Sequence, residues 1–188
     1  TSSVKGVLID AKQKIIAIAG APLKVSRPHS GWSEQSPEDW WKATNKVIAQ
    51  LKAARPKVVA AVEGIGLSGQ QHGATLLDAA DNVLRPCILW NDTRSHVEAA
   101  ALDADPRFRA LTGNICFPGF TAPKLVWVKN NEPAIFARVV KVLLPKDYLR
   151  LWLTGDHVAE MSDAAGTGWL ETGKRAWSDD LLAMTDLS

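Results

Sequence analysis

The chain has 188 residues, which is enough to bury a core of its own and fits a single domain. Its 46% hydrophobic and 22% charged content excludes a disordered, collagen-like or disulfide-stabilised chain. Its 22 Lys and Arg nearly balance 20 Asp and Glu without long runs of one sign, so no charged surface for nucleic acid or anionic membrane is indicated. We therefore expect a small-molecule ligand, with no nucleic acid and no membrane as partner.

The two cysteines, Cys87 and Cys116, have apolar neighbours and no spacing typical of metal ligands. Buried free thiols are the simplest interpretation, because unpaired cysteine is among the most buried residue types. No apolar run approaches the roughly 18 residues of a membrane helix, and the N-terminus shows no targeting pattern. These features favour a reduced, cytoplasmic setting and no bound metal ion.

The first third of the chain predicts a β-hairpin followed by a long helix. Residues 4–10 read as a strand, and a polar turn separates them from the apolar run at 15–19. The sequence Ser36-Pro37-Glu38-Asp39 is typical of a helix start, with an N-cap serine, proline at the first helical position and acids near the positive end of the dipole. Apolar spacing near 3.6 continues to Leu51, and the helix should end before Pro56.

The remaining elements alternate in a way that predicts an α/β fold with a mixed sheet flanked by helices. An apolar run leading into glycines over residues 58–69 predicts a buried strand that ends in a loop. A second hairpin follows, with runs at 74–77 and 83–89 around a turn at 78–82, and Pro86 placing part of the second run at an edge. Helical patterns then cover 94–102, 107–111, 123–129, 133–138 and 146–153, with a strand at 139–144 and a last short helix from Ser178.

One polar loop follows the strand predicted at 58–69 and contains Gln70, Gln71 and His72 between glycines. Ligands of α/β proteins bind at the carboxyl ends of strands, where loops converge on a rigid support. These side chains supply several donors and acceptors, and the glycines allow close approach of the backbone, which suits a polyhydroxylated ligand. A glycine-rich turn with incidental polar residues is the alternative that this feature leaves open.

Two further segments carry side chains suited to ligands. Trp90 precedes Asn91, Asp92 and Arg94, and an indole face can stack on a sugar while polar groups bind its hydroxyls. The alternative there is a helix start capped by Asp92. At the N-terminus, hydroxyls and a cation precede a strand and can surround a phosphate, a frayed terminus being the alternative; these residues are Thr1, Ser2, Ser3 and Lys5.

Taken together, six motifs resemble the FGGY family of carbohydrate kinases over essentially the whole chain. They lie at residues 26–29 with 32–35, 69–73, 84–86 with 89–92, 118–124, 144–150 and 162–167. Several of them are more similar to the branch that phosphorylates D-xylulose than to the glycerol branch, in which arginine and glutamate would replace Gln71 and His72. The resemblance implies a ribonuclease-H-like, actin-like domain and transfer of the γ-phosphoryl group of MgATP to D-xylulose or a similar small sugar.

The resemblance also implies roles for individual residues and cofactors. ATP and Mg²⁺ are the implied cofactors, Gln71 and His72 match a pair that contacts the sugar, and Trp90 matches a tryptophan that packs against it. Gln71 departs from the methionine expected there. The nucleotide phosphates would face the residues that match the end of the family's phosphate loop, namely Thr1, Ser2, Ser3 and Lys5.

The same resemblance implies parts that lie outside the chain. Residues 1–188 match an N-terminal sugar-binding domain whose opening strand and partner, a C-terminal kinase domain, are missing from the sequence. The catalytic base is expected beyond Ser188, so no catalytic residue is assigned and the chain alone should be inactive. A kinase for another ketose or sugar acid and a non-catalytic sugar-binding module are the alternatives, and the sequence leaves homodimer formation open.

Overall fold

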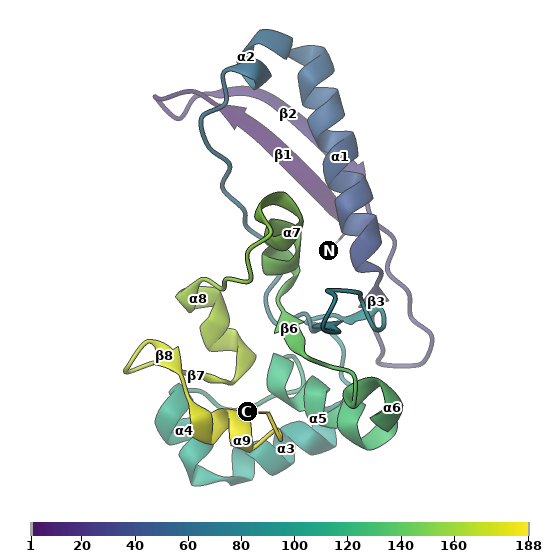
Figure 1. Ribbon diagram of the computed structural model, residues 1–188, viewed down its shortest axis with the longest axis vertical. Coiled ribbons are helices and arrows are strands. Elements are labelled where there is room, and N and C mark those ends of the chain that lie inside the picture. Colours follow the sequence, from purple (N-terminus) through teal and green to yellow (C-terminus); the bar gives the residue numbers. More distant parts are fainter. Residues whose placement is uncertain (1, 188) are drawn as a thin grey trace.

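The computed structural model describes residues 2–187, and its N-terminal part is a hairpin with a helix laid along it (Figure 1). Strand β1 (Ser3–Ile9) pairs antiparallel with β2 (Ile15–Pro22), from Ser3 opposite Pro22 to Ile9 opposite Ile15. The Asp10 carboxylate closes the turn by accepting the amides of Lys12 and Lys14, each at 2.9 Å. The predicted hairpin is confirmed.

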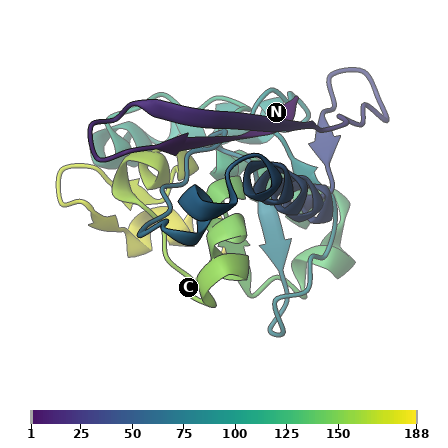
Figure 2. The ribbon, with the colours of Figure 1, turned by 90° about the horizontal axis from the view of Figure 1, so that it is seen from above.

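Helix α1 (Pro37–Ala54) runs along one face of this hairpin, as the view from above shows (Figure 2). Val47 and Leu51 are buried against it. A Cβ atom at Gly6 of β1 would lie 2.5 Å from Val47 Cγ1, so only glycine allows the helix to approach this closely. The helix begins and ends where the sequence predicted.

The other strands of the described chain form short antiparallel ladders in place of one long sheet. β3 (Glu34–Gln35) pairs with β5 (Cys87–Ile88), β4 (Thr75–Leu77) with β6 (Lys141–Leu143), and β7 (Leu170–Glu171) with β8 (Ala176–Trp177). A single bridge between Ala74 and Ile88 joins the first two ladders. The predicted α/β class is confirmed, with its strands distributed over these small sheets.

Helices pack around these ladders in the C-terminal half (Figure 1). They are α3 (His96–Ala104), α4 (Pro106–Thr112), α5 (Thr121–Asn131), α6 (Pro133–Phe136), α7 (Pro145–Thr154), α8 (Met161–Ala164), a 3₁₀ turn (Ala165–Thr167) and α9 (Asp179–Ala183). The largest buried cluster includes Leu76, Ile88, Phe108 and Leu125. Within residues 2–187, no helix combines the length and the apolar character needed to cross a membrane.

The strand predicted over residues 58–69 is wrong. Residues Pro56–Ala60 form a short helix, α2, and residues 62–70 are irregular, with Ile65 68% exposed. Pro56 presets a helical φ at the first position of α2, and an apolar run alone does not distinguish a strand from a helix. A Cβ atom added at Gly64 or Gly66 would meet no atom within 4 Å, so the described part of the chain packs nothing against these two positions.

Candidate functional site

The turn at residues 71–73 holds His72 in an unusual backbone conformation. Its φ is 65°, in the left-handed region that residues other than glycine rarely adopt. The His72 carbonyl accepts hydrogen bonds from Lys124 Nζ at 2.8 Å and from Thr121 Oγ1 at 3.2 Å. Both donors belong to α5, and such a strained conformation persists only where surrounding contacts enforce it. The start of α5 therefore fixes the backbone of His72.

The His72 ring is fixed as well. Its Nδ1 lies 2.7 Å from the Gly166 carbonyl, and the ring packs on Phe120 with the centroids 4.9 Å apart. A carbonyl oxygen only accepts hydrogen bonds, so Nδ1 carries the hydrogen of this contact. In the neutral ring, Nε2 then has no hydrogen and can accept a hydrogen bond from a ligand hydroxyl.

The surroundings of His72 favour this neutral ring. Burial lowers the pKa of His72 below its ordinary value of 6.5, and the charge of Lys124 lowers it further. The hydrogen bond to Gly166 and the charge of Asp163 act in the opposite direction without overcoming burial. At neutral pH, His72 therefore presents an acceptor nitrogen whose position is set by three other parts of the chain.

Gln71 lines a cavity of about 740 Å³ next to this turn, between the irregular segment that contains Ser68 and the helices α7 and α8. At one wall, Lys146 Nζ lies 2.7 Å from Asp147 Oδ1 and 2.8 Å from Asp163 Oδ2. Burial by itself would lower the pKa of Lys146, but hydrogen bonds to the two carboxylates raise it. The wall thus combines fixed donors and acceptors, as expected for a pocket that binds a polar small molecule.

Trp90 lies on a neighbouring loop and is not among the residues that line this cavity. Its side chain is 48% exposed. A Cβ atom at Gly119 would lie 2.9 Å from the Trp90 carbonyl oxygen, so the Trp90 loop touches the segment that leads to Phe120 and the His72 ring. The structure thus places Gln71 at the cavity, with His72 next to it in sequence. Trp90 lies outside the cavity lining and contacts the loop at residues 117–120.

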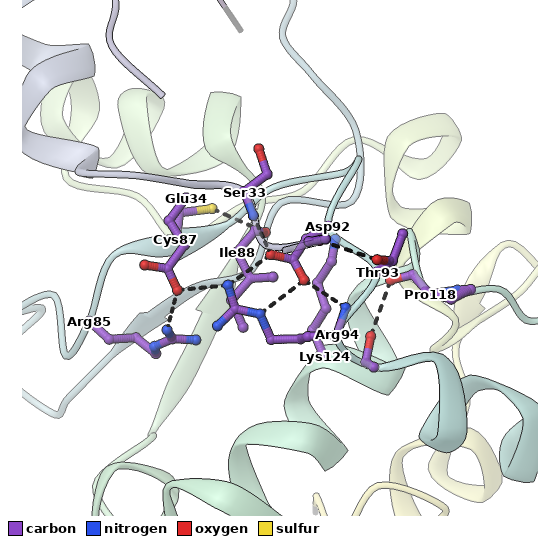
Figure 3. Close-up of polar contacts among 12 residues, drawn as sticks. Ser33, Glu34, Arg85, Cys87, Ile88, Asp92, Thr93, Arg94, Pro118 and Lys124 are labelled. Atoms are coloured by element: carbon purple, nitrogen blue, oxygen red, sulfur yellow. Dashed lines mark hydrogen bonds and ion pairs between the residues drawn. The ribbon is translucent and has the colours of Figure 1, made fainter. Parts of the chain in front are cut away.

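The charged residues that follow Trp90, Asp92 and Arg94, form contacts within the fold (Figure 3). Asp92 is buried, accepts the Ser33 amide at 2.6 Å and pairs with Arg94 at 2.7 Å. Glu34 Oε1 in turn pairs with Arg94 at 2.8 Å and with Arg85 at 2.6 Å. Arg94 also lies 3.6 Å from the centroid of the Trp32 ring. Asp92 therefore does not cap α3, whose N-cap is Ser95, and neither Asp92 nor Arg94 is free to bind a sugar.

Of the residues predicted to face a nucleotide, Ser3 and Lys5 lie on β1 and Ser2 directly precedes it. Ser3 is half-buried, while Ser2 and Lys5 are exposed and Lys5 is opposite Gly20 of β2. Thr1 lies outside the described residues. Their role stays a prediction.

The sequence assigned no role to Lys124 or Lys146 and predicted only a structural role for Gly166, and the structure places these residues around His72 and the cavity. Gly166 and Lys124 lie within motifs that carry the family resemblance. Lys124 contacts His72 from 52 positions away in sequence and Gly166 from 94 positions away, so no local pattern links them to it. One signal was available for Lys124: it directly precedes the apolar run from Leu125 to Val128.

Comparison with known proteins identifies the class to which this fold and site belong. The model of the N-terminal domain of the FGGY family of carbohydrate kinases matches residues 1–188. The chain belongs to this family, and solved members of the family show the actin-like, ribonuclease-H-like fold that the sequence implied.

Among the proteins similar to this chain, several are named xylulose kinase. The chain is 52% identical to the xylulose kinase of Escherichia coli K12, over 100% of this chain and 39% of that protein. It superposes with a TM-score of 0.99 and 67% identity on a structure described as a xyloylose kinase from Brucella ovis, covering 100% and 39% of the two chains. For xylulose kinase from Rhodospirillum rubrum the TM-score is 0.95 at 32% identity, again covering 100% and 39%. The chain thus spans about 39% of the length of these relatives.

Proposed function

We propose that the protein containing this chain transfers the γ-phosphoryl group of ATP to the terminal hydroxyl of D-xylulose, giving D-xylulose 5-phosphate. The chain would supply the sugar-binding part, and the catalytic base and a second kinase domain would lie outside residues 1–188. The observation that carries the proposal is His72, whose Nδ1 is bound to the Gly166 carbonyl so that Nε2 is left as an acceptor, and whose neighbour Gln71 lines a polar cavity. Relatives named xylulose kinase, at 52% and 67% identity, supply the choice of sugar.

The chain's own residues would bind and orient the sugar. Nε2 of His72 would accept a hydrogen bond from one hydroxyl, the carboxamide of Gln71 would bind a second, and the exposed indole of Trp90 would cover an apolar face. Phosphoryl transfer depends mainly on positioning and on neutralising charge, so a rigid sugar site contributes by holding the attacking hydroxyl in line.

A divalent metal, Mg²⁺, would accompany ATP and neutralise charge on the phosphates. Within residues 2–187 no three His, Cys, Asp or Glu side chains group to hold a metal ion. The nucleotide phosphates would face the start of the chain, namely Thr1, Ser2, Ser3 and Lys5. The protein would act in the cytoplasm.

A coupled assay of the full-length protein tests the proposal. ADP release should depend on D-xylulose, and the product should be the 5-phosphate. A structural neighbour at 25% identity is a gluconate kinase from Lactobacillus acidophilus, so gluconate, D-ribulose and glycerol belong in the same panel. A higher kcat/KM for any of these than for D-xylulose would replace the proposed substrate, and sugar binding without turnover would favour a non-catalytic module.

A further inference from the structure

The ammonium group of Lys124 is buried without a carboxylate. Its residue is 0% exposed, and its Nζ donates to two backbone carbonyls, those of His72 at 2.8 Å and Gly119 at 2.7 Å. The other buried cations of the site region are different, since Arg85 and Arg94 both pair with Glu34. Among residues 2–187, no carboxylate forms an ion pair with Lys124 in the same way.

This arrangement is costly for folding. Moving an ammonium group out of water is strongly unfavourable unless it is paired with an opposite charge, and burial lowers the pKa of Lys124 to about 7. The hydrogen bonds do not depend on the charge, because a neutral amine keeps two hydrogens, one for each carbonyl. Cys87, Asp92 and Arg94 also act on Lys124 electrostatically, and Lys124 itself acts on His72. Whether it is charged or neutral, the Lys124 side chain therefore links the two loops that carry these carbonyls.

Lys124 joins the turn that carries two of the proposed sugar residues to a segment that contacts the loop of the third. The turn is the one with Gln71 and His72. The segment is the one around Gly119, which touches the Trp90 carbonyl and leads to Phe120, the ring on which His72 packs. Both carbonyls are bound by one nitrogen atom, so the separation of the loops is limited by the length of two hydrogen bonds.

We propose that Lys124 is a positioning residue that holds His72 and the Gly119 segment at a fixed separation and thereby sets which sugar the site accepts. The inference rests on the proposed function for the identity of the sugar, but its geometric part concerns only this chain. Ketoses that differ in the configuration of one carbon place a hydroxyl differently by a distance comparable to a hydrogen bond. A site whose halves can shift relative to one another would lose its preference between them, and a misplacement of about 1 Å can reduce rates about 100-fold.

The test is Lys124→Met in the full-length protein, with kcat/KM measured for D-xylulose and for D-ribulose, which differ at one carbon. We expect the ratio of the two values to fall by about 10-fold or more, with the KM for ATP within about 2-fold of wild type. A purely structural role would reduce the amount of active enzyme and lower both rates together, leaving the ratio unchanged. An unchanged ratio in folded Lys124→Met protein would overturn the proposal. Lys129→Met, on the same helix with its side chain 41% exposed, is the matched control and should keep the wild-type ratio.

A second variant and a second measurement cover the case in which Lys124→Met does not fold. Thr121→Val removes the other donor to the His72 carbonyl and should change the ratio in the same direction by less. The ring signals of His72 in ¹⁵N-histidine spectra, identified by their loss in His72→Gln, should shift in both variants and not in Lys129→Met. Unshifted ring signals would contradict the link, whatever the enzyme phosphorylates. If the wild-type enzyme is inactive on D-xylulose but the ring signals still shift in the two variants, the proposed function is rejected and the link is retained.

Discussion

Gly166 and His72 occupy complementary space: a Cβ atom at residue 166 would lie 2.4 Å from His72 Cε1 and 2.6 Å from Nδ1. The ring cannot stay in place if any other residue replaces the glycine, because real Cβ atoms do not approach this closely. The same glycine supplies the carbonyl that accepts from Nδ1. Its backbone thus both orients the ring and leaves room for it.

The first prediction concerns this contact. Gly166→Ala should displace the His72 ring, raise the KM for the sugar by about 10-fold or more and destabilise the fold by about 1–3 kcal/mol through overpacking. Steady-state kinetics with each substrate varied in turn, together with a urea unfolding curve, measure the two effects. Gly173→Ala is the control, because a Cβ atom there meets nothing within 4 Å. Unaltered sugar kinetics in Gly166→Ala would show that the ring position is irrelevant to binding.

The second prediction is a pH dependence of sugar use. His72 must be neutral for Nε2 to accept a hydrogen bond, and burial lowers its pKa from 6.5. The kcat/KM for the sugar should therefore stay level as pH falls to 6.5 and decline only at lower pH. In His72→Gln, whose side chain does not titrate, this acidic decline should disappear. A decline centred above pH 6.5 that persists in His72→Gln would assign the effect to another group.

The third prediction separates the sugar end from the nucleotide end. Lys5→Ala should raise the KM for ATP or lower kcat, because a point charge that favours the phosphates is lost, while D-xylulose binding without nucleotide stays near wild type. His72→Ala should show the opposite pattern, with a loss of about 1–3 kcal/mol in sugar recognition. Isothermal titration with the sugar, beside kinetics with ATP varied, makes the comparison. Equal damage to both ligands in a cooperatively folding Lys5→Ala protein would refute the division.

The fourth prediction concerns stability and the buried ammonium group. The pKa of Lys124 is about 7 in the folded chain against an ordinary value of 10.5, so between these values the unfolded chain binds a proton that the folded chain does not. Stability contributed by this site should therefore increase as pH rises from about 7 towards 10.5. The free energy of unfolding of wild type relative to Lys124→Met should rise across this window, measured by urea unfolding of the full-length proteins at several pH values. A constant difference would show that Lys124 stays charged when folded.

Local patterns in the sequence determined the elements whose signals come from neighbouring residues. The hairpin before residue 22 and helix α1 followed from alternation, from the cap and proline at residues 36 and 37, and from apolar spacing, all of which act within a few positions. The loop at 69–73 was selected because glycines and polar side chains gather there. The motifs at 118–124 and 162–167 were noticed only through the family resemblance.

Tertiary structure alone decided what those local patterns leave open. Residues 58–69 have the composition of a buried strand, but a strand forms only where another offers its hydrogen bonds, and α2 and an exposed segment result. The geometry of His72 likewise depends on Lys124, 52 positions away, and on Gly166, 94 positions away. No local pattern encodes such a contact, since the distance between two loops is set by how α5 packs against the turn. The sequence alone indicated His72 as a site residue. Its backbone φ, its tautomer and the availability of Nε2 as an acceptor are determined by tertiary packing.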